Sequence, residues 1–285
     1  MLGSTRILGV FGHPIAHSLS PVMHNAAIRA LNIDYIYVPF HVLPDNLEQA
    51  VLGVRGLEIA GVNVTIPHKE RIIPFLDEVS DYSRQIRSVN TVTNVDGHLK
   101  GDTTDGPGFL RSAEAAWGKL DGCRVLILGA GGSAKAVSFA LAGAGCEIVI
   151  ANRTVERAAE LSRGLGKVFE SGTFRVVELG GQALGDEIPK IDLVVNTTSV
   201  GMHPDVDGIP IAPELLRKDL LVYDLVYNPA RTRLVCEAEE RGASAVTGLK
   251  MLVYQGALSF EMWTGIQAPV DVMEEAAIEA LGHRL

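Results

Sequence analysis

Residues 124–134 read RVLILGAGGSA, and this stretch decides the fold. Its first five residues are a mostly apolar run of the length of a buried strand, and small residues typical of a helix follow as far as Ala144. The next helical pattern covers residues 154–163. This alternation of strand and helix predicts an α/β fold, with a parallel sheet covered by helices on both faces. The strands expected in this part of the chain are residues 124–128, 147–151, 193–196 and 220–225.

The loop after the first of these strands has the glycine spacing of a dinucleotide-binding turn. Gly129 allows the tight turn, Gly131 lets the backbone approach a diphosphate, and Ala134 lets the helix pack closely on the strand. The start of the helix offers N–H groups and a partial positive charge. A structural glycine turn would have the same spacing, but the strand, helix and second strand around it favour nucleotide binding. The expected loop residues are Gly129, Ala130, Gly131, Gly132, Ser133 and Ala134.

The residues after the second strand indicate which dinucleotide binds. An NAD site usually carries an acidic residue there, which accepts a hydrogen bond from the ribose 2′-hydroxyl. Here the strand ends in Asn152, Arg153 and Thr154, with Arg157 one turn further on. A guanidinium group suits the 2′-phosphate of NADP, although solvated residues at the start of a helix would have the same composition. We expect NADP(H) to be the cofactor.

The first third of the chain and its tail are organised differently. Ser20 is expected to cap a helix that Pro21 opens. Asp96-Gly97 predicts a tight turn between two strands at residues 91–95 and 98–103. Other expected elements are strands at residues 6–11, 35–42 and 59–66 and helices at residues 43–54, 79–87, 249–265 and 270–281. We expect two domains: a substrate-binding domain of residues 1–105 and 248–285, and a Rossmann-type NADP-binding domain of residues 106–247.

Composition argues against several classes of protein. The net charge of −9, without a Lys/Arg cluster, argues against a nucleic-acid partner. Although 47% of the residues are hydrophobic, no uncharged apolar run approaches the ~20 residues of a membrane-spanning helix. The three cysteines are widely spaced and the eight histidines show no ligand spacing, so we expect no disulfide and no metal site. The first ten residues lack a secretion signal, and we expect a cytoplasmic enzyme, either a monomer or a homodimer, that acts on a small molecule.

A second polar stretch lies at the end of the strand expected at residues 59–66. Because alternate residues of a strand share a face, Asn63 and Thr65 lie on the same side, and Lys69 follows on the next turn. Reduction of a ketone needs a proton donor beside the forming alkoxide, and a lysine supplies both the proton and a positive charge. Taken alone, Lys69 is better explained as a surface lysine at a helix start. Ser18 and Ser20 add two hydroxyls beside a helix N-terminus, which is a suitable site for a carboxylate.

Short motifs follow one another along nearly the whole chain. They are GHPIAHSLSP at residues 12–21, NVTIPHK at 63–69, SVNTV at 88–92, GDTTDG at 101–106, NRT at 152–154, NTTSVGM at 196–202, DLVYNP at 224–229 and the segment at 248–257. With these motifs in this order, the chain resembles the shikimate dehydrogenase family. The resemblance implies reversible, NADPH-dependent reduction of 3-dehydroshikimate to shikimate, a step of aromatic amino-acid biosynthesis.

The resemblance also implies roles for individual residues. Lys69 and Asp105 would form the catalytic pair, in which Lys69 transfers a proton and Asp105 orients it. The substrate carboxylate would be bound by Ser18 and Ser20. The ring hydroxyls would be bound by Asn63, Thr65, Asn90 and Gln255, with Tyr227 nearby. The nucleotide would be bound by the glycine loop, by Asn152, Arg153, Thr154 and Arg157, and also by Thr197, Met202, Val226 and Gly248.

The chain departs from the family pattern at three positions. Thr103 stands where the family usually has Asn, and His13 stands where it often has Asn. Lys135 replaces an arginine that is common near the glycine loop. None of these changes removes a catalytic group.

Two alternative functions remain open on the sequence. One is a quinate/shikimate dehydrogenase of broader specificity, and the missing acidic residue after Ile150 argues against its use of NAD. The other is a non-catalytic NADP-binding regulatory paralogue, and the retention of both Lys69 and Asp105 argues against it.

Overall fold

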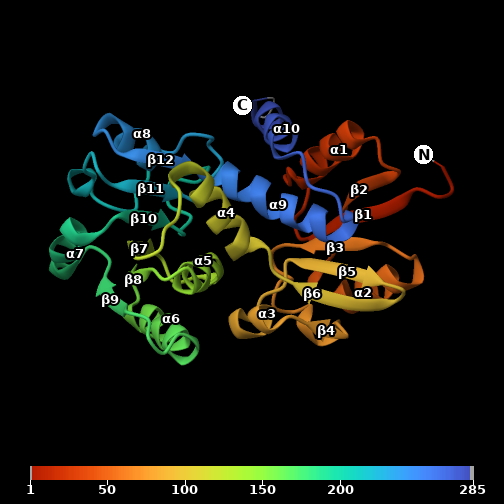
Figure 1. The fold of residues 1–285 in the computed structure, drawn as a ribbon, viewed down its shortest axis with the longest axis horizontal. Helices are drawn as coiled ribbons and strands as arrows, with labels where there is room; N and C mark the ends of the chain where they lie inside the picture. The colour runs from red at the N-terminus through yellow and green to blue at the C-terminus, as the bar shows by residue number, and fades with distance from the viewer. Residues whose placement is uncertain (1, 283–285) are drawn as a thin grey trace. The chain divides into compact units, whose positions relative to one another are not determined.

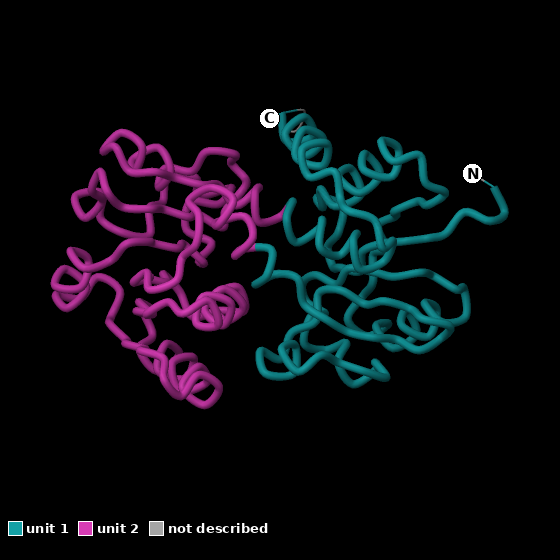
Figure 2. The backbone as a smooth tube through the Cα atoms, in the orientation of Figure 1, with its two compact units in different colours: residues 1–108, 253–285 teal, residues 109–252 magenta. Residues whose placement is uncertain are grey.

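A computed structural model describes residues 2–282 of the chain. These residues form two compact units: the first contains the chain up to Gly108 and from Val253 onward, and the second contains Phe109–Leu252 (Figure 2). Helices α4 (Asp105–Trp117) and α9 (Gly248–Thr264) each contain one of the boundaries between the units. Residue 1 and residues 283–285, which belong to the expected substrate-binding domain, lie outside the described residues.

The second unit is built on a six-stranded parallel sheet (Figure 1). The strand order is β12-β11-β10-β7-β8-β9, so the order reverses between β7 and β10. In open α/β sheets, ligands bind beyond the carboxyl ends of the strands at such a reversal. The strands are β7 (Arg124–Leu128), β8 (Glu147–Asn152), β9 (Phe174–Glu178), β10 (Leu193–Asn196), β11 (Leu221–Asp224) and β12 (Ser244–Thr247).

The helices of the second unit cover this sheet and explain its apolar sequence. Helix α5 packs on β7 and β8, α6 on β8 and β9, and α8 on β11 and β12. As a result, the β7 residues from Val125 to Leu128 are all fully buried, as the apolar run predicts. The expected α/β fold is confirmed. The helices are α5 (Gly132–Gly143), α6 (Val155–Val168), α7 (Gln182–Glu187) and α8 (Arg233–Glu240), with short 3₁₀ helices η3 (Ile188–Lys190) and η4 (Pro213–Leu215).

The first unit contains a six-stranded sheet of mixed direction, in the order β2-β1-β3-β5-β6-β4. Strand β1 pairs in parallel with β2 and β3, whereas β5 runs antiparallel to both β3 and β6. The strands are β1 (Arg6–Gly12), β2 (Tyr35–His41), β3 (Gly61–Val64), β4 (Glu78–Val79), β5 (Thr91–Val95) and β6 (His98–Asp102). The other elements are α1 (Ser20–Leu31), η1 (Pro44–Asn46), α2 (Leu47–Gly56), η2 (Ile73–Phe75), α3 (Asp81–Ile86) and α10 (Val270–Gly282).

The predictions from local sequence in this unit were partly correct. Asp96 and Gly97 have φ values of 53° and 86°, so the Asp-Gly turn between β5 and β6 is confirmed. The expectation that Ser20 caps α1 was wrong, because Ser20 is the first helical residue and Leu19 occupies the cap position. The strand expected at residues 59–66 is only Gly61–Val64, so Thr65 lies just beyond its end.

Some elements carried no clear sequence signal. Residues 164–185 contain the end of α6, strand β9 and the start of α7. Strands β9 and β12 lie at the two edges of their sheet and are largely half-exposed, so neither shows a continuous apolar run. Across residues 2–282, we find no helix with the length and apolar character needed to cross a membrane.

Candidate functional site

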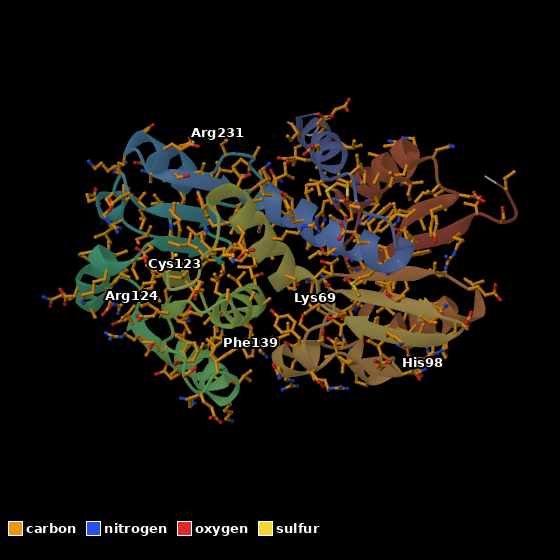
Figure 3. All side chains as sticks on the ribbon, in the orientation of Figure 1. Lys69, His98, Cys123, Arg124, Phe139 and Arg231 are labelled. Carbon is orange, nitrogen blue, oxygen red and sulfur yellow. The ribbon has the colours of Figure 1, made fainter. Side chains whose placement is uncertain are left out.

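Lys69 and Asp105 form an ion pair in the first unit. Lys69 Nζ donates to Asp105 Oδ2 at 2.5 Å, although the two residues are 36 positions apart in the sequence. Lys69 lies on the turn after β3, where its carbonyl accepts a hydrogen bond from the Val89 N–H, and Asp105 is the first residue of α4. The Lys69 side chain is 30% exposed and that of Asp105 is 14% exposed (Figure 3 labels Lys69). The pair is thus open enough to meet a ligand and fixed enough to orient the ammonium group.

Asn90 joins this pair to Gln255. The Asn90 Nδ2 group donates to Asp105 Oδ1 at 2.8 Å and to Gln255 Oε1 at 3.2 Å. Its Oδ1 accepts from the backbone N–H of Thr104 at 2.8 Å, which fixes the orientation of the amide because an N–H can only donate. Both oxygens of Asp105 therefore have donors, one from Lys69 and one from Asn90.

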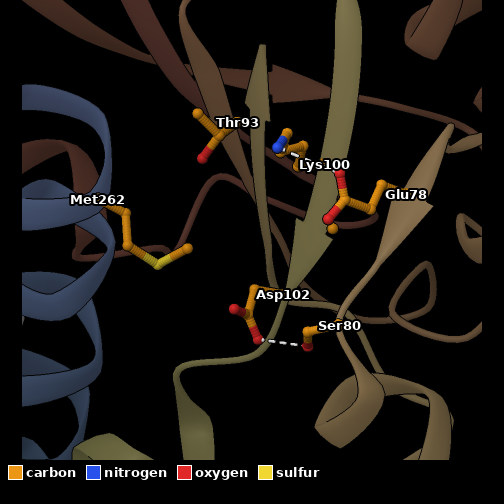
Figure 4. A pocket seen from close by; sticks show the side chains of 7 residues that line it. Glu78, Ser80, Thr93, Lys100, Asp102 and Met262 are labelled. Atoms are coloured by element: carbon orange, nitrogen blue, oxygen red, sulfur yellow. Dashed lines mark hydrogen bonds and ion pairs between the residues drawn. The ribbon is translucent and has the colours of Figure 1, made fainter. Parts of the chain in front are cut away.

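Asp102 stabilises the turn that leads into Asp105. The Asp102 Oδ1 atom accepts from the Ser80 hydroxyl at 2.8 Å (Figure 4) and from the Thr103 N–H at 2.7 Å. Thr103 itself is buried, and its hydroxyl has no hydrogen-bond partner within residues 2–282. The departure from the family pattern at Thr103 therefore places a buried hydroxyl beside the turn that leads into Asp105 without using its hydrogen-bonding capacity.

Of the other expected substrate residues, Tyr227 lies in the second unit, and the rest lie in the first: Ser18, Ser20, Asn63 and Thr65. Ser18 is half-buried, and its Oγ accepts from the N–H of Ser20 at 3.3 Å, at the start of α1. The Thr65 N–H donates to the carbonyl of Phe11 at 2.9 Å, just past the end of β3. Ser18 lines a hollow whose other lining residues are Pro14, Ile15, Ala16, Pro21, Pro39 and His41. His13, the second departure, pairs with His41 through Nδ1 and Nε2 at 2.6 Å.

The glycine loop of the second unit has the backbone that its sequence predicts. Gly129 has φ of 110°, and a Cβ there would lie 2.7 Å from Thr197 Oγ1, so only glycine fits without strain. A Cβ at Gly131 or Gly132 would meet nothing within 4 Å, which leaves open space above the loop. Helix α5 starts at Gly132, and no side chain caps it within the described part of the chain. These are the features that a diphosphate needs at a helix N-terminus.

The residues expected to recognise the adenosine end follow β8. Asn152 ends the strand, and its Nδ2 donates to the carbonyl of Thr154 at 2.8 Å. Arg153, Thr154 and Arg157 are all exposed at the start of α6. Two exposed guanidinium groups just after the end of β8 suit a phosphate on the ribose.

The remaining nucleotide residues lie in the second unit, and one of them, Val226, contacts a buried carboxylate. Asp224, fully buried at the end of β11, accepts from Asn196 Nδ2 at 2.9 Å, from Thr232 Oγ1 at 2.5 Å and from the Val226 N–H at 3.0 Å. Desolvation is the largest influence on this carboxyl and raises its pKa above the usual value. A Cβ at Gly248 would collide with the carbonyl of Leu225. These contacts fix the chain around Val226 and Gly248, while Met202 is exposed and Tyr227 half-buried in the same unit.

The sequence reasoning missed the residues that hold these side chains in place. Tyr37, Thr91, Thr104 and Ser259 are buried polar residues of the first unit, and each is hydrogen-bonded to Asn63 or Asn90. The only available signal was Ser259, a polar residue one helical turn after Gln255 in an apolar helix.

Comparison with known proteins matches three segments of the chain to family models. The shikimate dehydrogenase substrate-binding domain matches residues 10–92, the shikimate/quinate 5-dehydrogenase model residues 111–202, and the shikimate 5′-dehydrogenase C-terminal domain residues 248–278. The shikimate dehydrogenase (NADP(+)) of Moorella thermoacetica is 49% identical over 280 residues, which is 98% of this chain and 95% of that protein.

Two solved structures illustrate the range of similar enzymes. Shikimate 5-dehydrogenase from Thermus thermophilus, in complex with NADP(H) and shikimate, has a TM-score of 0.87 and 40% identity, covering 96% of this chain and 99% of its own. Quinate dehydrogenase from Corynebacterium glutamicum, in complex with NAD, has a TM-score of 0.89 and 30% identity, with coverage of 96% and 99%.

Proposed function

The chain belongs to the shikimate dehydrogenase family, and from that premise we propose that it catalyses the reversible, NADPH-dependent reduction of 3-dehydroshikimate to shikimate. The single observation that carries this proposal is the Lys69–Asp105 ion pair, bonded through Asn90 to Gln255. A regulatory protein that only binds NADP would need no such pair. The pathway that this reaction serves is aromatic amino-acid biosynthesis.

Lys69 is the proposed proton donor. In the direction of reduction, its ammonium group gives a proton to the oxygen of the substrate carbonyl and stabilises the negative charge that develops there. In the reverse direction, the neutral amine takes the proton from the hydroxyl. Asp105 holds Lys69 by one carboxylate oxygen and is positioned by Asn90 through the other. The carboxylate thus orients the lysine and offers an acceptor to a neighbouring ring hydroxyl.

The rest of the proposed substrate site is a set of short polar side chains. Ser18 and Ser20 bind the carboxylate, because hydroxyls and N–H groups at a helix start suit an anion. The ring hydroxyls are bound by Asn63, Thr65, Asn90 and Gln255, and we assign Tyr227 to the same substrate. We assign the residues 1–105 and 248–285 to the substrate-binding domain and residues 106–247 to the NADP-binding domain.

The cofactor site fits NADP(H) on the geometry of the second unit. NADPH supplies the hydride that is added to the carbonyl carbon. The open space above Gly131 and Gly132 and the uncapped start of α5 accommodate the diphosphate. We propose that Arg153 and Arg157, with Asn152 and Thr154, bind the 2′-phosphate, and that Thr197, Met202, Val226 and Gly248 contact the rest of the nucleotide.

The experiment that tests this function compares kcat/KM for shikimate and quinate with NADP and with NAD. The proposal predicts the highest value for shikimate with NADP. A higher value for quinate, or for NAD, would favour the broader quinate/shikimate dehydrogenase, and no turnover with any combination would favour the regulatory paralogue. We also propose a cytoplasmic location and a monomeric or homodimeric state, which cell fractionation and light scattering would test.

A further inference from the structure

The amide of Asn63 is hydrogen-bonded to the protein through both its nitrogen and its oxygen. Its Nδ2 group donates to the backbone carbonyl of Asn90 at 3.1 Å and to Ser259 Oγ at 2.9 Å, and it makes a longer contact to Thr91 Oγ1 at 3.3 Å. Its Oδ1 accepts from the Tyr37 hydroxyl at 2.8 Å. Asn63 is 5% exposed, and Tyr37 and Ser259 are more deeply buried. A side chain proposed to bind a ring hydroxyl therefore arrives at the site with both N–H groups already used.

The direction of these hydrogen bonds follows from partners that allow no choice. The carbonyl of Asn90 can only accept, so the nitrogen of the Asn63 amide must face it. The oxygen then faces Tyr37, whose hydroxyl donates. One lone pair of Oδ1 is left over. Asn63 can consequently offer a ligand an acceptor and no donor.

Ser259 is the residue that joins this amide to helix α9. Its hydroxyl donates to the carbonyl of Gln255, one turn earlier in the helix, at 3.1 Å. The same oxygen lies 2.8 Å from Thr91 Oγ1 and 3.2 Å from Thr104 Oγ1. One buried hydroxyl thus connects β3, β5, the turn before Asp105 and the helix that carries Gln255.

We propose that Ser259 is a positioning residue, which fixes the Asn63 amide so that Asn63 meets the substrate only as an acceptor. This proposal rests on the proposed function and deepens it, because it assigns the direction of one substrate hydrogen bond. Ser259 lies behind Asn63 and acts through it. Without the serine hydroxyl, one N–H of Asn63 loses its nearest acceptor and keeps only the longer contact to Thr91 Oγ1 at 3.3 Å, so the amide is held less firmly and can turn that N–H toward the substrate.

The first test is Ser259→Ala, with Ser138→Ala as the matched control. Ser138 is also a buried serine within a helix, but its hydroxyl has no hydrogen-bond partner in the described part of the chain. Loss of one positioned hydrogen bond corresponds to about tenfold in affinity. Ser259→Ala should raise the KM for shikimate about tenfold with kcat and the KM for NADP nearly unchanged, and Ser138→Ala should leave all three unchanged. A fall in kcat without a change in the KM for shikimate would overturn the proposal.

A double-mutant comparison separates positioning from general damage. If Ser259 acts through Asn63, Ser259→Ala has no further effect once Asn63 is replaced by alanine. Multiplied losses in the double variant would mean that Ser259 acts independently of Asn63. If Ser259→Ala fails to fold, Tyr37→Phe removes the opposite hydrogen bond of the same amide and should show the same dependence on Asn63.

Solvent exchange of the Asn63 amide can be measured without enzymatic turnover, so it tests this proposal separately from the proposed function. The side-chain ¹H–¹⁵N signals of Asn63, assigned by their loss in Asn63→Ala, report how firmly the amide is held. They should exchange with solvent slowly in the wild type and in Ser138→Ala, and much faster in Ser259→Ala. Equal protection in all three proteins would refute the positioning role, whatever the activity on shikimate. Absence of activity with slow exchange that Ser259→Ala abolishes would instead refute the proposed function alone.

Discussion

Burial of His24 predicts that the first unit loses stability in acid. The residue is fully buried on α1, and its ring stacks on Tyr37 with the ring centroids 4.2 Å apart. Neither ring nitrogen has a hydrogen-bond partner within residues 2–282. Desolvation by this burial lowers the pKa of His24 from 6.5 to about 3. The folded protein therefore holds the neutral ring.

The size of the effect follows from the two pKa values. Because the folded value is the lower one, the unfolded chain takes up the proton first as the pH falls. The stability tied to the neutral ring is fully present above the unfolded pKa of about 6.5 and is lost below it, at about 1.4 kcal/mol per pH unit. Between about pH 7 and about pH 5 the free energy of unfolding should fall by about 2 kcal/mol through His24.

The test compares urea unfolding of the wild type and of His24→Phe at these two pH values. Phenylalanine keeps a ring of similar size at this position and cannot be protonated. The fluorescence of Trp263, in a Trp117→Phe background, reports on the first unit. The wild type should lose about 2 kcal/mol more stability on acidification than His24→Phe, while Met23→Leu, a non-titrating change at the adjacent buried position, should lose as much as the wild type. Equal losses in the wild type and His24→Phe would refute the reasoning.

Three further predictions concern the two sites. Arg153→Ala should raise the KM for NADP about tenfold or more and the KM for NAD much less, because only NADP carries the 2′-phosphate; equal changes would contradict the assignment. Asp105→Asn should lower kcat about 100-fold because the neutral amide cannot form an ion pair with the ammonium group, and an unchanged kcat in initial-rate assays would argue against the pair. Gly129→Ala should cost about 1–3 kcal/mol of unfolding free energy, since the new Cβ meets the Thr197 hydroxyl at a positive φ. Gly131→Ala, which has open space, is the control in urea unfolding, and similar losses for both would contradict the strain.

The nucleotide half of the molecule could be predicted in detail because its signals are local. A buried parallel strand is apolar throughout, and the turn after it needs glycine at fixed positions, so residues 124–134 contain both pieces of information. The edge strands β9 and β12 could not be predicted in the same way, since half-exposed strands carry no apolar run. The position of Ser20 was wrong by one residue for a different reason. Serine before proline is typical of a helix cap, but here Leu19 is the cap and Ser20 is the first helical residue.

The substrate half depended on contacts between distant parts of the chain. Lys69 carried no meaning until its motif was set beside the motif that contains Asp105, and the resemblance to a family supplied that link. The contact between Asn63 and Ser259 spans 196 residues and had no counterpart in any motif. Spacing reveals residues that share one strand or one turn, whereas a hydrogen bond between a strand and a helix from the tail exists only in the folded unit.

The proposed role of Lys69 in shikimate oxidation is tested most directly by the initial rate of NADPH formation from shikimate and NADP by the wild type and by Lys69→Ala. We expect turnover by the wild type, a kcat that is lower by about 100-fold to 10,000-fold in the variant, and a KM for shikimate that stays nearly the same. A wild-type protein that forms no NADPH from shikimate, or a Lys69→Ala variant with near-normal kcat, would contradict the proposed role.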